Sequence, residues 1–437
     1  MTQADLIIIG AGPGGYETAA RAVADGLKVV IIERDQPGGT CLNRGCIPTK
    51  TLFQSALTAD TVCRAAEFGI SCSAPAVDFP AVMRRKDEVV ASLRQGVTAE
   101  LKGAILIEGE ARFNGNVVEV NGESYSAPRI VIATGSAPAR LNIPGAELAL
   151  DSDALLSTSE LPESIIIIGG GVIGMEFASI LNALGVKVTV LEYCREIVPA
   201  LDAEVAKRLR MTLRKGGIEI TTSASVTSIN NVEGKLSVNF TEKGKEKSAE
   251  AAMVLMATGR RAVIPEGFRE AGGEVDSRGF IVTADDYATS IPGVYAIGDV
   301  NGKCMLAHAA TAQGMSLLGH EMNTEVIPSV VFTMPECAMV GLTEQQSLDR
   351  GLNIVTGKST FRANGKAVAS GETDGMVKII ADADSGLILG CHICGSHAAD
   401  LIQEATIAIA SGMTAEGLRS VVHPHPTLSE ALYAAIP

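Results

Sequence analysis

The chain has 437 residues, of which 46% are hydrophobic, and its formal net charge at pH 7 is −14. This length is sufficient for roughly two to four domains with buried cores. The negative charge argues against nucleic acid or an anionic membrane surface as a partner, because both would be repelled. No apolar run approaches the roughly 20 residues of a membrane-spanning helix, so we expect no membrane span.

The cysteines and the first residues of the chain indicate a compartment. The 9 cysteines are an odd number without regular spacing, unlike the framework of a secreted disulfide-rich protein. An apolar strand is expected from Leu6, which leaves no room for a signal or transit peptide before it. We therefore expect a cytoplasmic protein in which one cysteine pair is oxidised for function.

The first predicted elements form a strand, a glycine-rich turn, an alanine-rich helix and a second strand that ends at Glu33. The same unit recurs from Ile165, and its second strand ends at Glu192. In such units the glycines let backbone N–H groups approach a pyrophosphate, and the strand-end carboxylate accepts hydrogen bonds from ribose hydroxyls. The predicted phosphate-loop glycines are Gly10, Gly12, Gly14 and Gly15 in the first unit and Gly169, Gly171 and Gly174 in the second.

Each unit should therefore hold one ADP moiety. After Glu192 the second unit has a single nearby arginine, Arg195. A 2′-phosphate would meet the negative charge of Glu192, so NAD is favoured over NADP.

Two cysteines, Cys41 and Cys46, lie in a segment at 39–50 that is punctuated by glycine and proline. On an ideal α-helix their Cα atoms would be separated by roughly 7.5 Å of rise, beyond the limit of about 7 Å for a disulfide. The segment must therefore distort if the two sulfurs bond. A strained, exposed disulfide is of the labile kind used in catalysis, so the sequence predicts a redox-active pair.

Later apolar runs end at Gly135 and Gly259, and each is predicted to close a nucleotide-binding unit. A strand that begins after Gly293 is expected to end in Asp299, close to a ligand. From about residue 327 the pattern changes to strands, for example at 330–332 and 375–380, followed by a long apolar helix at about 398–412. This change suggests a separate C-terminal α+β domain.

The paired cysteines, the doubled glycine unit and the tail from His423 to Glu430, which reads His-Pro-His-Pro-Thr-Leu-Ser-Glu, occur together. In this combination the whole chain resembles the disulfide-dependent flavoprotein reductases, the pyridine nucleotide-disulfide oxidoreductase family, and most closely its dihydrolipoamide dehydrogenase branch. The resemblance implies FAD on the first unit, NAD on the second, and a homodimer in which the tail of one subunit completes the active site of the other.

The implied fold class is α/β, with two Rossmann-like dinucleotide-binding domains and a C-terminal α+β dimerisation domain. The predicted boundaries are 1–140 for the FAD domain, completed by about 263–325, then 141–262 for the NAD domain and 326–437 for the dimerisation domain. The chain lacks an N-terminal lipoyl domain, so the lipoyl group would arrive on a partner protein. That partner would belong to a 2-oxo acid dehydrogenase complex or a glycine cleavage system.

The resemblance also implies roles for individual residues. Cys41 would be the thiol that meets substrate sulfur, and Cys46 the thiol that faces the flavin. His425 would be the base and Glu430 would orient it, with a cis peptide bond before Pro426. The resemblance further implies an ion pair between Lys50 and Glu176 beside the flavin. The implied flavin contacts are Thr40, Lys50, Ala111, Gly135, Asp299 and Ala307. The implied contacts to the nicotinamide dinucleotide are Val226 and Gly259.

Two other functions stay open. One is a related FAD-dependent reductase that acts on another small disulfide or a quinone. The other is a flavoprotein with a mainly structural role in a larger assembly. The absence of a C-terminal cysteine pair argues against mercury reduction, and Glu192 argues against the NADPH-dependent glutathione reductase branch.

The remaining cysteines are expected to be structural, and no metal site is expected at the His-Pro-His tail. Cys391 and Cys394 lie in a strand-like run, where residues three apart point to opposite faces, so they should not bond to each other. Ordinary packing is expected for Cys63, Cys72, Cys194, Cys304 and Cys337.

Overall fold

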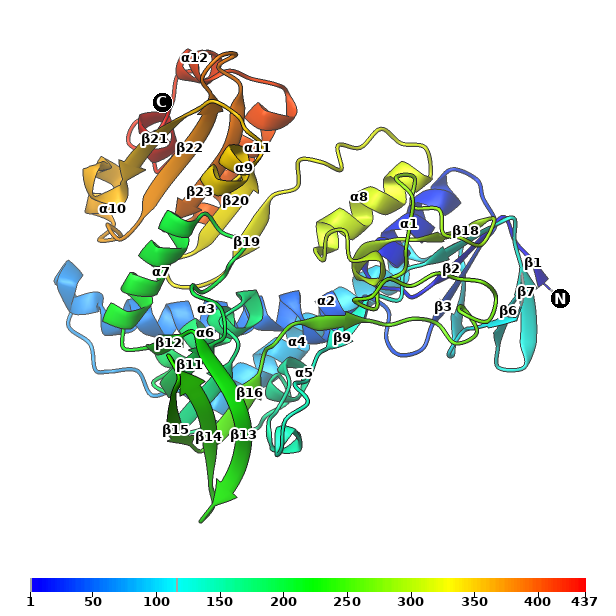
Figure 1. The fold of residues 1–437 in the computed structure, drawn as a ribbon, viewed down its shortest axis with the longest axis horizontal. Helices are drawn as coiled ribbons and strands as arrows, with labels where there is room; N and C mark the ends of the chain where they lie inside the picture. Colours follow the sequence, from blue (N-terminus) through cyan, green and yellow to red (C-terminus); the bar gives the residue numbers. More distant parts are fainter. Residues whose placement is uncertain (1, 115–116) are drawn as a thin grey trace. The chain divides into compact units, whose positions relative to one another are not determined.

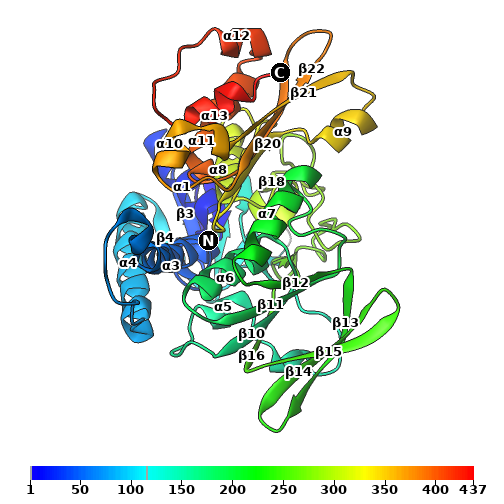
Figure 2. The same ribbon diagram turned by 90° about the vertical axis from the view of Figure 1, so that its left-hand side faces the viewer.

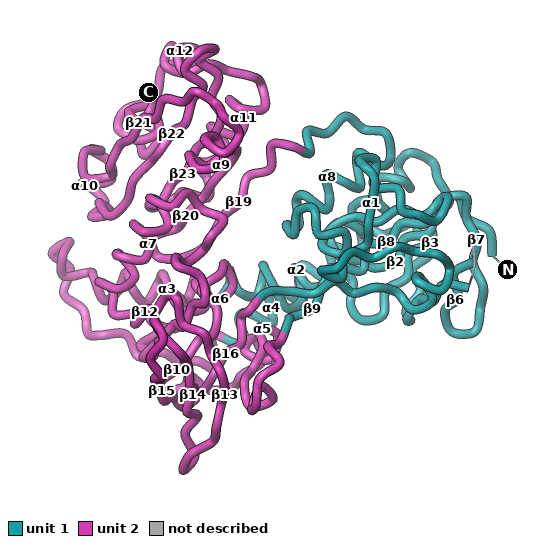
Figure 3. Tube along the Cα trace, viewed as in Figure 1, with its two compact units in different colours: residues 1–51, 83–139, 259–324 teal, residues 52–82, 140–258, 325–437 magenta. Residues whose placement is uncertain are grey.

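The computed structural model describes residues 2–114 and 117–437 (Figure 1; Figure 2). They divide into two compact units (Figure 3). Unit 1 comprises residues up to 51, 83–139 and 259–324, and unit 2 comprises residues 52–82, 140–258 and 325–437. These cuts lie near three of the predicted boundaries, but the predicted NAD and dimerisation domains fall within one unit. The division into three domains therefore stays a prediction.

Unit 1 is built around a five-stranded parallel sheet with the order β18-β8-β2-β3-β4 (Figure 1). The central strands consist of apolar residues that are buried on both faces of the sheet, as expected for a parallel sheet. The strands are β2 (Leu6–Ile9), β3 (Val29–Glu33), β4 (Ile105–Glu108), β8 (Arg129–Ile132) and β18 (Val294–Ala296). The predicted strands of the first glycine unit are thus confirmed.

The helices of unit 1 follow from local sequence. Helix α1 (Pro13–Ala24) begins with a proline at its first position, where no N–H is needed. It packs against α8 (Ala307–Leu317) through small residues, because a Cβ on Gly14 would lie 3.1 Å from the Cβ of Ala310. Helix α2 (Gly39–Arg44) carries Cys41. Helices α3 (Cys46–Cys63) and α4 (Phe79–Glu100) each run across a boundary between the units.

Two smaller sheets complete unit 1. One has the order β1-β7-β6-β5, and its Phe113 packs edge-on against Phe268 with ring centroids 5.8 Å apart. The other pairs β9 (Ser136–Pro138) with β17 (Arg260–Ala262). The four strands of the first are β1 (Thr2–Gln3), β5 (Arg112–Asn114), β6 (Val117–Val120) and β7 (Glu123–Ser126).

Unit 2 repeats the parallel arrangement in the sheet β12-β11-β10-β16. Its strands are β10 (Ser164–Ile168), β11 (Lys187–Glu192), β12 (Glu219–Thr222) and β16 (Met253–Met256). Helix α6 (Val172–Ala183) follows β10, and α7 (Ala203–Lys215) follows β11. An antiparallel sheet of β13 (Ala224–Val232), β14 (Lys235–Glu242) and β15 (Lys245–Ala251) precedes β16. The second glycine unit is therefore also confirmed as a strand–helix–strand element.

The C-terminal part of unit 2 is an antiparallel sheet with the order β19-β20-β23-β22-β21. Its strands are β19 (Ser329–Val331), β20 (Cys337–Gly341), β21 (Ile354–Thr360), β22 (Met376–Asp382) and β23 (Ile388–Cys394). Apolar residues of α11 (Ala398–Ala410) and α13 (Ser429–Ala434) share one buried cluster with the sheet. The helix predicted at 398–412 ends at Ala410 because Gly412 adopts a left-handed φ of +62°.

The opposite face of this sheet meets α7 through buried charges. Lys378 on β22 is 1% exposed, and its Nζ donates to Asp202 Oδ1 at 2.9 Å and to Glu344 Oε2 at 2.5 Å. Burial alone would lower the pKa of Lys378, but the hydrogen bonds to Glu344 and Asp202 outweigh burial and raise it. Asp202 also caps α7 by accepting from the N–H of Glu204. The cluster therefore fixes the start of α7 against the sheet.

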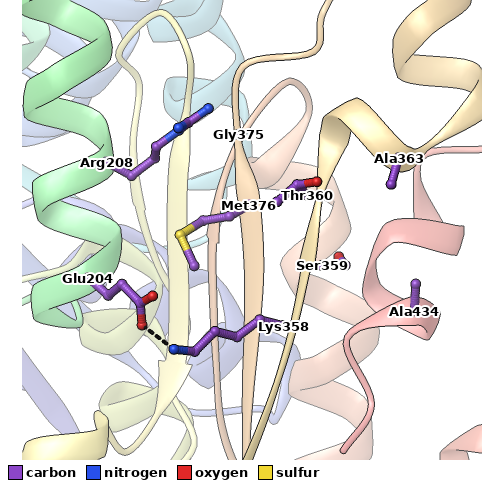
Figure 4. A pocket seen from close by; sticks show the side chains of 9 residues that line it. All are labelled: Glu204, Arg208, Lys358, Ser359, Thr360, Ala363, Gly375, Met376 and Ala434. Carbon is purple, nitrogen blue, oxygen red and sulfur yellow. Dashed lines mark ion pairs between the residues drawn. The ribbon is translucent and has the colours of Figure 1, made fainter.

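A pocket of about 520 Å³ lies beside this cluster, between α7, β21, β22 and α13 (Figure 4). An ion pair of 2.7 Å joins Lys358 to Glu204 along one side of it. None of the predicted site residues lines this pocket. Among the described residues, no helix is both long enough and apolar enough to cross a membrane.

Candidate active site

The segment that carries the two cysteines is broken between them. Helix α2 ends at Arg44, Gly45 leaves the helical conformation with φ −142° and ψ −110°, and α3 begins at Cys46. A Cβ on Gly45 would lie 2.9 Å from the backbone oxygen of Thr40, so a larger residue would strain the break. The distortion that a bond between Cys41 and Cys46 requires is therefore part of the fold.

Both cysteines are thiols in this structure, and they are hydrogen-bonded to each other. That hydrogen bond, together with burial, raises the pKa of Cys41. Cys46 is exposed and is the first residue of α3, where the partial positive charge of a helix N-terminus stabilises negative charge. The structure therefore favours the protonated form of Cys41 and places Cys46 at a helix start.

The cysteine segment lies directly against the first phosphate loop. The N–H of Gly38 donates to Ala11 O at 2.8 Å. Gly39 has a φ of +57°, and a Cβ there would lie 2.6 Å from Gly12 Cα, so two constraints require glycine. Asn43 Nδ2 donates to Gly39 O at 2.9 Å. Any group held by the first phosphate loop is therefore adjacent to the segment that carries the redox pair.

The first phosphate loop has the features of an anion site. Gly12 precedes α1 without a side-chain cap, so backbone N–H groups at the helix start remain available. A Cβ on Gly12 would have only Gly39 Cα within 4 Å, at 3.9 Å, which leaves room for a ligand. At the end of β3, Glu33 Oε2 accepts from Ala11 N at 2.6 Å and Oε1 accepts from Asp35 N at 2.9 Å. Burial raises the pKa of Glu33.

The second phosphate loop repeats this construction. Gly171 precedes α6 without a side-chain cap, and a Cβ there would have no neighbour within 4 Å. Glu192 at the end of β11 accepts from Gly170 N through Oε2 and from Cys194 N through Oε1. Each loop therefore fits a pyrophosphate, and each glutamate lies where a ribose would bind.

Asp299 belongs to a three-membered cluster in unit 1. The strand predicted to end in this acid, β18, ends at Ala296, and Asp299 lies in the following 3₁₀ turn. Its carboxylate accepts from Ser136 Oγ, which in turn accepts from Arg260 Nε at 2.7 Å. Arg260 also donates to Ser136 O at 2.7 Å. The carboxylate is thus held in one orientation.

The tail forms the expected pair of a histidine and an acid. His425 Nδ1 lies 2.9 Å from Glu430 Oε1, and Thr427 N donates to Glu430 Oε2 at 2.8 Å. The hydrogen bonds from Thr427 and His425 lower the pKa of Glu430, so it is a carboxylate at neutral pH. The peptide bond between His425 and Pro426 is cis, as predicted.

The predicted site residues are distributed over both units of the structure. Lys50 lies in unit 1, while Glu176 lies in unit 2, where it is buried and accepts from Phe332 N at 3.0 Å. Their ion pair therefore stays a prediction. Among the other predicted contact residues, unit 1 contains Thr40, Ala111, Gly135, Gly259 and Ala307, and unit 2 contains Val226.

Comparison with known proteins gives the family. Residues 4–314 match the model of the pyridine nucleotide-disulphide oxidoreductases, and residues 327–436 match the dimerisation domain of the same proteins. The chain belongs to the pyridine nucleotide-disulphide oxidoreductase family. It is similar to dihydrolipoyl dehydrogenases from Thermus scotoductus (41% identity, 99% of this chain and 96% of the relative) and Bacillus subtilis (39%, 99% and 97%).

A solved structure is also similar over the full length. The HOCl-induced flavoprotein disulfide reductase RclA from Escherichia coli has 29% sequence identity and a TM-score of 0.87, covering 99% of each chain. As a member of this oxidoreductase family, the chain is a flavoprotein that uses FAD and NAD. Its C-terminal residues form the family's dimerisation domain, which supports a homodimer.

Some predictions for cysteines outside the redox pair were wrong. Cys63, Cys72 and Cys194 were expected to be packed, but they are exposed, because each lies at the end of an element or in a connecting segment. Cys337 is buried, as expected, and it also lies opposite Cys394 in the register of β20 and β23, where the two thiols are hydrogen-bonded.

The expectation for the other cysteine of that strand is confirmed. Cys391 contributes to the apolar cluster under α11, whereas Cys394 contacts Cys337, so the two side chains of β23 lie on different faces. Sequence reasoning also missed Ser136 and Arg260 as partners of Asp299, although both directly follow glycines that it had singled out.

Proposed function

We propose that this protein is a dihydrolipoyl dehydrogenase, which oxidises protein-bound dihydrolipoamide to lipoamide with NAD⁺. The observation that carries the proposal is the segment with Cys41 and Cys46. Its helix is interrupted at Gly45, between the two cysteines, and the segment packs against the first phosphate loop. Relatives named dihydrolipoyl dehydrogenase, which align over nearly the whole chain, support the choice of substrate. The partner would be a lipoyl-bearing protein of a 2-oxo acid dehydrogenase complex or a glycine cleavage system, in the cytoplasm.

In the oxidised enzyme, one substrate thiolate attacks the sulfur of Cys41. A sulfur–sulfur bond forms between substrate and Cys41, the bond between Cys41 and Cys46 breaks, and Cys46 leaves as a thiolate. The second substrate thiol then gives its proton to His425 and attacks the first substrate sulfur. Lipoamide leaves and Cys41 is released, so two electrons pass from the substrate to the cysteine pair.

The residues around the pair support these steps. The start of α3 stabilises the thiolate of Cys46. Glu430 holds Nδ1 of His425 and stabilises the protonated ring, which leaves Nε2 as the basic atom. FAD, when bound, supplies the route for two electrons from the reduced pair to NAD. By the arrangement of the family, His425 would act in the active site of the other subunit of the homodimer.

The test is formation of NADH from dihydrolipoamide and NAD⁺, with NADP⁺ in a parallel reaction. Turnover with NAD⁺ is expected, and Cys46→Ser should abolish it because a serine cannot form the disulfide. Cys72→Ser is the matched control, since Cys72 is exposed and distant in sequence from the pair. A flavin-loaded protein that fails to oxidise dihydrolipoamide would exclude this substrate.

A second candidate is a reductase of another small disulfide or a quinone. The similarity to RclA, a flavoprotein disulfide reductase with another name, favours keeping this candidate. NADH oxidation in the presence of lipoamide, other low-molecular-weight disulfides and quinones separates the two. A mainly structural role would be indicated if a Cys46→Ser protein still assembled with its partners and caused no growth defect.

A further inference from the structure

The tail contains two histidines in contrasting environments. The side chain of His425 is 78% exposed. The side chain of His423, two residues earlier, is only 7% exposed and contacts a different acid, Glu404 on α11. The family resemblance assigns a role to the exposed histidine but none to the buried one.

Both ring nitrogens of His423 have hydrogen-bond acceptors as partners. Nε2 lies 2.5 Å from Glu404 Oε1, and Nδ1 lies 3.0 Å from Val421 O. These two contacts fix the orientation of the imidazole ring between α11 and the backbone of the tail.

His423 joins two helices at the base of the loop. Its ring lies 5.0 Å from the ring of Tyr433, centroid to centroid, and Tyr433 belongs to α13. Helix α13 also carries Glu430, the partner of His425. One side chain thus links α11 to the helix that orients the exposed histidine.

The loop is fixed on the other side of His425 as well. Thr427 Oγ1 donates to Pro424 O at 2.7 Å, and Asn364 Nδ2 donates to Thr427 O at 2.9 Å. Together with the contacts of His423, these bonds hold the backbone before and after the exposed imidazole. Glu430 responds to the same arrangement: hydrogen bonds from Thr427 and His425 lower its pKa most, and the charge of His423 adds to this effect.

We propose that His423, held by Glu404 on α11 and packed against Tyr433 on α13, is a positioning residue that fixes the orientation of the His425–Glu430 pair. The inference rests on the proposed function, in which His425 is the base for substrate thiols. His423 itself touches no substrate. Its effect should therefore appear only in steps that need a correctly oriented base.

The test compares two single-turnover reductions of the oxidised, flavin-loaded dimer. Dihydrolipoamide reduces the enzyme through the base, whereas NADH reduces it from the dinucleotide side without the tail histidine. In His423→Gln, reduction by dihydrolipoamide should slow by about 100-fold, the loss typical of a catalytic group displaced by 1 Å. Reduction by NADH should keep its wild-type rate. Glu404→Gln keeps the side-chain shape but not the charge, and should give a smaller loss of the same kind.

Control variants define what each result means. His425→Gln should abolish reduction by dihydrolipoamide, and His397→Asn should change neither rate. His397 is 63% exposed in the same part of the chain, and its left-handed φ of +57° is one that asparagine tolerates. Equal losses with both reductants would show a merely structural role for His423, and a wild-type rate in His423→Gln would also overturn the proposal.

If the proposed function is wrong, the wild-type dimer itself will be reduced by NADH but not by dihydrolipoamide. This outcome differs from a failure of the inference about His423, which appears only in the variant. A second readout does not depend on substrate. The chain has 6 histidines, so ¹⁵N NMR of the dimer can report the ring of His425. The signals of His425 should shift in His423→Gln and stay unchanged in His397→Asn. Unchanged His425 signals in His423→Gln would overturn the proposal.

Discussion

The two phosphate loops share the same hydrogen bonds but contact different segments. In the first loop, the carbonyl of Ala11 accepts from Gly38, which leads directly into the helix of Cys41. In the second loop, the carbonyl of Gly170 accepts from Val198, which leads toward the start of α7. The segment that follows the strand ending in glutamate, β3 or β11, therefore decides whether a phosphate loop is part of a reaction site or only a binding site.

The loops also differ in how far they are enclosed. In the first, Gly12 faces Gly39 and Gly14 faces Ala310 on α8. In the second, a Cβ on Gly171 would meet nothing within 4 Å, and the neighbouring Val172 is 37% exposed. An enclosed loop suits a cofactor that stays bound, and an open loop suits one that exchanges at every turnover. The four predictions below test this comparison.

The largest loss of stability is expected at a glycine that both phosphate loops require for close packing, Gly15 in the first and Gly174 in the second. A Cβ on Gly15 would overlap the carbonyl oxygen of Gly10, and one on Gly174 would overlap that of Gly169. Gly15→Ala and Gly174→Ala should each lower the free energy of unfolding by about 1–3 kcal/mol. Gly15→Ala should also lose FAD, whereas Gly174→Ala should keep FAD and lose affinity for NAD.

Urea unfolding, flavin absorbance and the KM for NAD measure these changes. Gly96→Ala in α4 is the matched control, because a Cβ there meets nothing within 4 Å. This control should be neutral or stabilising by about 0.5–1 kcal/mol. Normal flavin content in Gly15→Ala would remove the distinction between the two loops.

A methyl group at the second glycine of each phosphate loop, Gly12 or Gly171, tests the space for the ligand without straining the fold. Gly12 and Gly171 have φ values of −72° and −73°, and neither has a close neighbour, so alanine should fold without strain. The methyl group would occupy the space of the pyrophosphate. Gly171→Ala should raise the KM for NAD by about 10–100-fold, which corresponds to roughly 1–3 kcal/mol of overpacking. Gly12→Ala should be isolated without flavin and should have the urea stability of the flavin-free wild type.

The acid of the second loop tests the choice of dinucleotide. Glu192→Gln weakens hydrogen bonds from ribose hydroxyls and removes the charge that opposes a 2′-phosphate. The KM for NAD should rise by about tenfold, equivalent to roughly 1.4 kcal/mol, and the preference for NAD over NADP should narrow. Steady-state kinetics with both dinucleotides measure the change. An unchanged preference would show that Glu192 does not select between them.

The smallest effect concerns the pH dependence of Glu33. Burial raises the pKa of Glu33 above its usual 4.5, so the charged form destabilises the folded, flavin-free protein. Its contribution to stability is complete at pH values below 4.5 and is lost as the pH rises through the raised pKa. Flavin-free Glu33→Gln should therefore match the wild type in urea at low pH and exceed its stability at neutral pH. The opposite trend would contradict the burial of this carboxyl.

Much of the fold could be predicted because its signals are local. Apolar runs such as Leu6–Ile9 and the glycine turns after them lie within a few residues of one another. The break at Gly45 also follows from local geometry, since two cysteines at this spacing on one helix could not bond. Patterns of this kind predict an element without knowledge of its neighbours.

The parts of the site that could not be predicted depend on contacts between distant segments. Ser136, Arg260 and Asp299 come from three separate segments, and no periodicity links them. The contact between His423 and Glu404 likewise depends on how the tail returns to α11. The pairing of Cys337 with Cys394 needs the register of β20 and β23, which composition does not specify.

The cysteines of the native protein differ in solvent exposure, and therefore in their reactivity toward labelling reagents. An alkylating reagent added to the folded, reduced chain should modify Cys63, Cys72 and Cys194 together with Cys46, because all four are exposed thiols. Cys337, Cys391 and Cys394 are buried and should react only after unfolding. Modification of these buried thiols in a native sample therefore measures the fraction of molecules that unfold. A background with the three exposed non-redox cysteines replaced would make Cys46 addressable by a single probe.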